Sequence, residues 1–105
     1  MRRNKYGNKI VIVDGIKFHS QKEGKRYAEL LLLLREGVIS DLATQVPYQV
    51  EVNGKKICKY VADFVYRDLE NHGTVVEDVK GYRTDIYKLK KKLVEAIYNF
   101  TITEI

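Results

Sequence analysis

The residues best suited to chemistry are two aspartates and a lysine near the middle of the chain. Asp63 lies inside one apolar run rich in β-branched and aromatic residues, and Asp78 and Lys80 lie in a second such run. The polar segment Arg67–Gly73 between the runs predicts a hairpin of two strands. Residues two apart on a strand share a face, so Asp78 and Lys80 point one way and Glu77 points the other. If the strands pair with both aspartates on one side, three functional side chains converge.

Such a convergence needs a compensating charge. Two neighbouring carboxylates repel each other, and burying either of them unpaired is costly. A divalent cation removes both penalties, and Mg²⁺ prefers carboxylate oxygens together with water and substrate phosphate. A lysine beside that cation can orient or deprotonate a water molecule, or stabilise charge on the phosphate. In a chain with 31% charged residues, a strand with one solvated face explains these three residues equally well when they are taken alone.

Length and composition limit the class of protein. The 105 residues suffice for one domain with a modest core, and an apolar share of 45% argues against disorder. No segment reaches transmembrane length, and the N-terminus lacks the apolar core of a signal peptide. The single cysteine, Cys58, excludes an internal disulfide and a cysteine-based zinc site. We expect a flexible basic segment over residues 1–7, a single domain over residues 8–105, no membrane association and a cytoplasmic location.

Positive charge is concentrated in two segments. Residues 1–9 contain four basic residues and no acid, and residues 80–92 contain six basic residues and one acid, in a chain with a net charge of +5. This distribution favours a polyanionic partner, most simply nucleic acid. A loose basic tail and a solvated helix face would give the same pattern.

The chain begins with a predicted hairpin and helix. Asp14-Gly15 between two short apolar runs predicts a tight turn. Ser20 with Glu23 forms a capping-box pattern, which predicts a helix that ends near Gly37. The five leucines Leu30–Leu34 cover more than one face of that helix, so we expect it to be buried on two sides.

The second half of the chain predicts strands around one further helix. Strands over residues 43–52 and 55–66 flank the turn signal Asn53-Gly54, and a strand over residues 74–80 follows. Thr84 predicts the N-cap of a helix over Asp85–Tyr98, and residues 100–105 predict a final strand. The predicted core face of that helix consists of Ile86, Leu89, Leu93, Val94 and Ile97.

The pattern Asp63-x14-Asp78-x-Lys80 resembles the PD-(D/E)XK nuclease motif, with Ala62 in place of the proline of its name. The predicted order of elements is similar to the αβββαβ core of the restriction-endonuclease-like fold. Nearly the whole chain resembles a small family of uncharacterised bacteriophage and prophage proteins assigned to that superfamily. The segments that carry this resemblance are Asp14–Phe18 with Ser20 and Glu23, Ile39–Leu42, Gln45–Tyr48, Tyr60–Phe64, Val76–Gly81 and Thr84–Lys90. The resemblance implies an α+β fold with a mixed central sheet flanked by two helices and preceded by a β-hairpin.

The resemblance also implies a function. It indicates a Mg²⁺-dependent DNA endonuclease of phage replication, recombination or packaging, acting in the bacterial cytoplasm, with branched DNA as one candidate substrate. Asp63, Asp78 and the backbone carbonyl of Val79 would hold the metal, for which Mn²⁺ is expected to substitute. Glu23 would contribute directly or through water, unless its carboxylate only completes the capping box. Lys80 would position or activate the attacking water.

Other residues complete this hypothesis. The residues expected to contact DNA are Tyr82, Arg83, Lys88, Lys91 and Lys92. Tyr87 either stacks on a base with Tyr82 or packs against the sheet, and Gln45 either supports the site from behind or pairs strands. Because enzymes of this fold that cut two strands commonly act as symmetric dimers, we expect a homodimer through the surplus leucine face or the hairpin Lys9–Phe18. The alternative function is an inactive DNA- or protein-binding module on the same fold.

Overall fold

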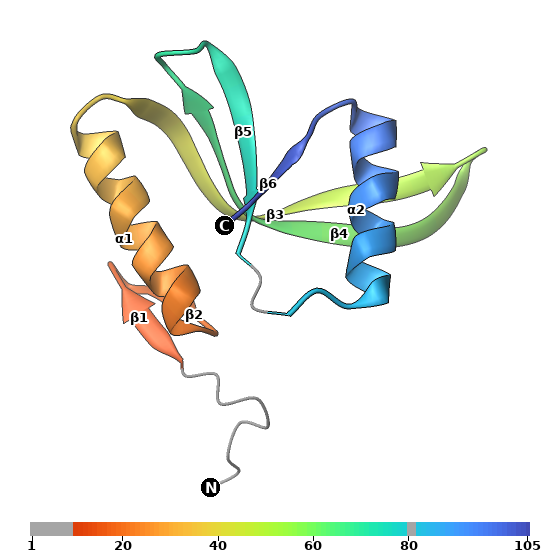
Figure 1. The fold of residues 1–105 in the computed structure, drawn as a ribbon, viewed down its shortest axis with the longest axis horizontal. Coiled ribbons are helices and arrows are strands. Elements are labelled where there is room, and N and C mark those ends of the chain that lie inside the picture. The colour runs from red at the N-terminus through yellow and green to blue at the C-terminus, as the bar shows by residue number, and fades with distance from the viewer. Residues whose placement is uncertain (1–9, 80–81) are drawn as a thin grey trace, which may run out of the picture.

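The protein has an α+β fold with an N-terminal hairpin, two helices and a four-stranded mixed sheet (Figure 1). The computed structural model describes residues 10–79 and 82–105. In chain order the elements are β1 (Val11–Val13), β2 (Ile16–Phe18), α1 (Gln21–Arg35), β3 (Ile39–Val52), β4 (Lys55–Asp68), β5 (Gly73–Asp78), α2 (Asp85–Tyr98) and β6 (Ile102–Glu104). The predicted fold class and order of elements are confirmed.

The sheet has the strand order β3-β4-β5-β6, while β1 and β2 form a separate antiparallel pair. The pairs β3–β4 and β4–β5 are antiparallel, and β6 joins β5 in parallel. Pro47 lies in β3, which is an edge strand and therefore tolerates a residue without a backbone N–H. None of the helices in the described ranges is long and apolar enough to cross a membrane.

The strand β4 has two halves with different neighbours. Its second half, from Phe64 to Asp68, pairs with β3 on one side and with β5 on the other. Its first half pairs with β3 in a long ribbon, which extends beyond the rest of the sheet, and α2 lies across it (Figure 1). Asp63 lies at the junction between the two halves.

Two hydrophobic clusters cover opposite faces of β5. The first cluster joins α1 to the sheet and has Phe18, Tyr27, Leu30 and Phe64 at its centre. The second cluster joins α2 to the ribbon and includes Val50, Tyr60, Ala62, Val76, Tyr87, Val94 and Ile102. Val75 packs against the first cluster and Val76 belongs to the second, as strand alternation requires.

The N-terminal hairpin packs against the start of α1. Ser20 caps this helix, because its side-chain oxygen accepts a hydrogen bond from the Glu23 amide at 3.1 Å. A Cβ at Gly24 would lie 3.0 Å from the Val11 side chain, which explains a glycine in the first turn. Leu32 and Leu34 stay exposed, so part of the leucine face remains on the surface as the homodimer prediction requires.

The predicted core face of α2 is confirmed for Val94 and Leu93, which lie in or against the second cluster, and wrong for the other three residues. Ile86, Leu89 and Ile97 are 68%, 59% and 42% exposed, whereas Tyr87 and Val94 are buried. Tyr87 turns inward because its ring packs in the second cluster while its hydroxyl donates a hydrogen bond to Glu104. The helix is therefore rotated relative to its apolar stripe, and three of its large aliphatic side chains are exposed.

Glu77 anchors α1 to β5. Its buried carboxylate accepts a hydrogen bond from Arg26 Nε at 2.8 Å, a second from Arg26 Nη2 and a third from the Tyr66 hydroxyl. These bonds to Glu77 raise the pKa of Arg26, which remains charged. Glu77 thus faces α1, opposite to Asp78, as the alternation of side chains predicts.

Replacing Glu77 by alanine should destabilise the protein, because it leaves the Arg26 guanidinium and the Tyr66 hydroxyl without their buried acceptor. We expect the free energy of unfolding, measured by urea denaturation, to fall by about 3 kcal/mol. Glu29→Ala removes the exposed partner of the same arginine and should change stability by less than about 0.5 kcal/mol. Equal effects of the two substitutions would show that the buried contact does not stabilise the fold.

Candidate active site

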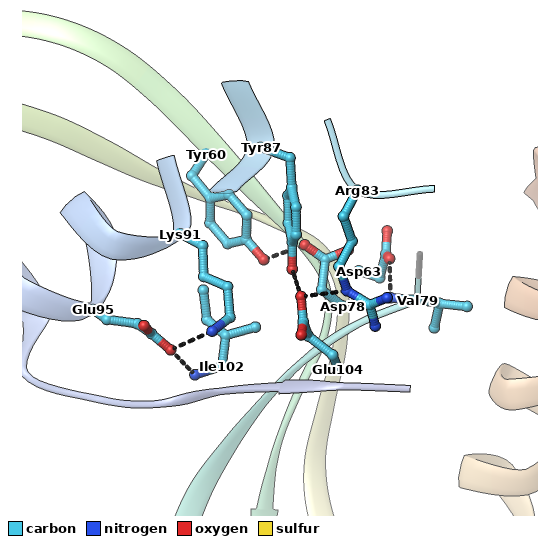
Figure 2. A network of polar contacts seen from close by, with 10 residues as sticks. All are labelled: Tyr60, Asp63, Asp78, Val79, Arg83, Tyr87, Lys91, Glu95, Ile102 and Glu104. Carbon is cyan, nitrogen blue, oxygen red and sulfur yellow. Dashed lines mark hydrogen bonds and ion pairs between the residues drawn. The ribbon is translucent and has the colours of Figure 1, made fainter. Parts of the chain in front are cut away.

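The candidate site forms where β4 and β5 separate. Their ladder ends at the pair Phe64–Glu77, so the next residues on each strand are Asp63 and Asp78. The Val79 amide donates a hydrogen bond to Asp63 Oδ2 at 2.7 Å (Figure 2). Asp63 and Asp78 are only 6% and 0% exposed. The two aspartates therefore meet in the interior, as the sequence predicted.

The surroundings of Asp63 disfavour the charged form of its carboxyl group. Burial, hydrogen bonding to the Asp78 carboxyl and the charges of Glu23 and Asp78 raise the pKa of Asp63 from 3.8 to about 7, against the opposing effect of the Val79 amide. With a pKa of about 7, a large part of the Asp63 carboxyl is protonated near neutral pH, because burial beside other carboxylates disfavours its charged form.

Tyr60 fixes the orientation of Asp78. Its hydroxyl donates a hydrogen bond to Asp78 Oδ2, and burial followed by this bond raises the pKa of Tyr60, so the phenol remains protonated. The sequence does not predict the contact between Tyr60 and Asp78, because regular alternation along β4 places Tyr60 on the face opposite to Asp63. Tyr60 and Ala62 belong to the second cluster, whereas Phe64 belongs to the first, so β4 changes its facing near Asp63.

A second acid lies beside Asp78 on β6. Glu104 is the parallel-strand partner of Asp78, and its carboxylate accepts hydrogen bonds from the Tyr87 hydroxyl at 2.8 Å and from Arg83 Nε at 2.9 Å (Figure 2). Burial raises the pKa of Tyr87, whereas the bond to Arg83 lowers the pKa of Glu104. The sequence did not identify Glu104, because β5 and β6 pair in parallel across the intervening helix α2, and no pattern of neighbouring residues predicts that pairing.

Glu23 lies close enough to Asp63 to affect it. Its amide is the capped group of α1, and its charge raises the pKa of Asp63. Val79 contributes its amide to Asp63 while its side chain is buried in the first cluster. Lys80 lies outside the described residues.

Gln45, Tyr82 and Tyr87, which the sequence predicts to lie near the site, differ in their burial. Gln45 is exposed on β3, between the pairs Thr44–Phe64 and Val46–Ala62, so it lies opposite Asp63. Its supporting role stays a prediction. Tyr87 packs inside the protein, whereas Tyr82 is on the surface.

The predicted DNA-contacting cations are of two kinds. Lys88 and Lys92 are exposed on α2. Lys91 forms an ion pair with Glu95 at 3.3 Å, and Arg83 is paired with Glu104. Their charges are thus partly offset within the protein.

Comparison with known proteins gives a family. Residues 3–103 match the model of the family described as "Protein of unknown function (DUF1064)". The chain belongs to this family. No curated protein and no solved structure matches it.

The side chains of the candidate site can be compared with the ligands that a metal ion requires. Among the residues that the structure describes, no cluster of three or more histidine, cysteine, aspartate or glutamate side chains surrounds a single metal position. Asp63 and Asp78 alone fit Mg²⁺, which is commonly held by one or two carboxylates while it keeps water and binds substrate phosphate. A hard cation at this position would also relieve the repulsion that raises the pKa of Asp63.

The pKa of Asp63 makes stability depend on pH. Between pH 3.8 and about 7 the folded protein retains a proton that the unfolded chain has released, so stability falls as the pH rises through this range. In EDTA, we expect urea denaturation to show a loss on the order of a few kcal/mol, most of it absent in Asp63→Asn, whose amide oxygen can still accept from Val79. The same pH dependence in both proteins would contradict a raised pKa at Asp63.

Proposed function

We propose that the protein is a metal-dependent deoxyribonuclease that hydrolyses phosphodiester bonds. The observation that carries this proposal is the buried pair Asp63–Asp78 at the end of the β4–β5 ladder, in an environment that raises the pKa of Asp63 to about 7. A fold rarely maintains two adjacent buried carboxylates without a cation or a catalytic use for them. The concentration of basic residues just after the pair, in residues 80–92, supports a polyanionic substrate.

Each residue of the site has a defined task in this proposal. Asp63 and Asp78 would hold Mg²⁺ or Mn²⁺, with Glu23 adding negative charge from α1 and the Val79 carbonyl as a further ligand. When bound, the metal would offset the charge of the scissile phosphate and lower the pKa of a coordinated water. The Val79 amide orients Asp63, and the Tyr60 hydroxyl orients Asp78.

The remaining parts of the proposal rest on the sequence. Lys80 shares the strand face of Asp78 in the sequence pattern and would position or activate the attacking water. Lys88 and Lys92 on the exposed side of α2 would contact phosphates, with Arg83, Lys91 and Tyr82 nearby in the chain. The resemblance to uncharacterised phage and prophage proteins assigned to the PD-(D/E)XK superfamily favours a role in phage DNA replication or recombination in the bacterial cytoplasm. A homodimer would supply the two sites that cleavage of both strands needs.

A binding module without catalysis is the second candidate. It is favoured by the three exposed aliphatic side chains on α2, Ile86, Leu89 and Ile97, because a protein partner could cover such a surface. In this case the two aspartates would remain a structural element of the core, and metal would not lead to cleavage.

Substitution of the aspartates by asparagine separates these functions. Asp63→Asn and Asp78→Asn keep the shape and the hydrogen-bond acceptors, so both variants should fold, with equal or greater stability in EDTA. Cleavage of labelled single-stranded, duplex and branched DNA in Mg²⁺ or Mn²⁺ should fall more than about 100-fold.

Asp68→Asn is the matched control, since Asp68 is the last residue of β4, at the far end of the β4–β5 ladder from the site, and accepts hydrogen bonds from Asn71. This variant should cut DNA at the rate of the unmodified protein. Failure of the unmodified protein to cut any of the three DNA forms, or undiminished cleavage by Asp78→Asn, would reject the nuclease.

A further inference from the structure

A groove of about 330 Å³ lies between β4 and the first turns of α2. Its walls include Lys59 and Val61 from β4 and Ile86 and Lys90 from α2, with Tyr60 and Tyr87 also lining it. None of the four wall residues was singled out as a DNA contact in the sequence.

The groove adjoins the candidate active site through its two tyrosines. The Tyr60 hydroxyl bonds to Asp78, and the Tyr87 hydroxyl bonds to Glu104, the strand partner of Asp78 (Figure 2). Both tyrosines thus line the groove while their hydroxyls bond to acidic side chains of β5 and β6. A molecule in the groove would therefore lie one side chain away from the two aspartates.

The chemistry of the walls combines cations with apolar surface. Lys90 Nζ lies 3.4 Å from the Lys59 carbonyl oxygen, so its side chain reaches across the groove from α2 to β4. Lys59 is exposed on the β4 wall, and Ile86 and Val61 add accessible aliphatic surface to the lining. Ammonium groups suit phosphate oxygens, and aliphatic side chains suit the face of a base.

The size of the groove limits the ligand. A volume of about 330 Å³ is at the lower end of the range of roughly 300–1,000 Å³ that ligand sites span, which suits a single nucleotide. In a duplex each base is stacked and paired, and its removal from the stack is costly. A nucleotide in a single-stranded segment has its base available at little cost.

We propose that this groove binds one unpaired nucleotide of a DNA strand whose neighbouring phosphate reaches Asp63 and Asp78. The proposal rests on the nuclease function and specifies its substrate class: DNA with a single-stranded segment at the site of cleavage. Lys59 and Lys90 hold the backbone phosphate of this nucleotide, and Ile86 packs against its base.

The test measures DNA binding without cleavage. Fluorescence anisotropy in EDTA gives the dissociation constants of a labelled single-stranded oligonucleotide and of the duplex of the same sequence. The unmodified protein should bind the single strand more tightly than the duplex. The double variant Lys59→Glu/Lys90→Glu should weaken single-strand binding about tenfold or more, and Ile86→Ser should weaken it about fivefold with duplex binding unchanged.

Matched variants control for charge and for lost apolar surface. Lys55→Glu/Lys56→Glu makes the same change of net charge at exposed positions outside the groove, and Leu89→Ser removes an exposed aliphatic side chain from another part of α2. Both should bind the single strand within about twofold of the unmodified protein. Equal losses in the two double variants, or no preference for the single strand, would overturn the groove as a nucleotide site.

The two proposals fail in different ways. If groove variants lose single-strand binding while the unmodified protein cuts no DNA in Mg²⁺ or Mn²⁺, the nuclease is rejected and the nucleotide site stands. If the protein cuts DNA and the groove variants bind and cut single strands normally, the nucleotide site is rejected and the nuclease stands.

Discussion

The candidate site depends on the burial of two neighbouring carboxyl groups, Asp63 and Asp78, at the point where two paired strands separate. Backbone pairing between β4 and β5 stops at this point, and the Val79 amide turns to the side chain of Asp63 instead. The pair is tolerated because the Tyr60 hydroxyl and the Val79 amide supply donors, and because the raised pKa of Asp63 lets this residue keep its proton up to about neutral pH. In the proposed function, a divalent cation bound by the two carboxylates would replace that proton.

Two consecutive residues of β5 have different roles: Glu77 links the sheet to α1, and Asp78 belongs to the candidate site. Glu77 points toward α1, where Arg26 and Tyr66 satisfy its charge and fix the helix to the sheet. Asp78 points toward α2, and the hydroxyl of Tyr60, a residue of β4, orients its carboxylate. Loss of the first carboxylate should therefore affect stability, and loss of the second should affect function. The same alternation gives each helix its own hydrophobic cluster and leaves the acidic pair between them.

Local sequence signals predicted the elements well, because turns and caps are encoded by neighbouring residues such as Asn53-Gly54, Ser20 and Thr84. Strand alternation likewise predicted that the two aspartates meet. Long-range features were missed. The rotation of α2 depends on Tyr87, whose hydroxyl partner Glu104 lies on the last strand, and no periodicity of apolar residues contains that contact. Tyr60 was missed because β4 changes its facing within its length, which a strict two-residue period cannot represent.

The most direct test of this account measures the binding of Mn²⁺ in the absence of DNA. The electron paramagnetic resonance signal of the free ion reports how much Mn²⁺ remains unbound. The account predicts binding at about pH 8, weaker binding at about pH 5 because Asp63 is then protonated, and loss of binding in Asp63→Asn and Asp78→Asn with Asp68→Asn unaffected. Undiminished binding in both site variants, or no binding by the folded protein at either pH, would contradict the claim that the buried aspartates form a metal site.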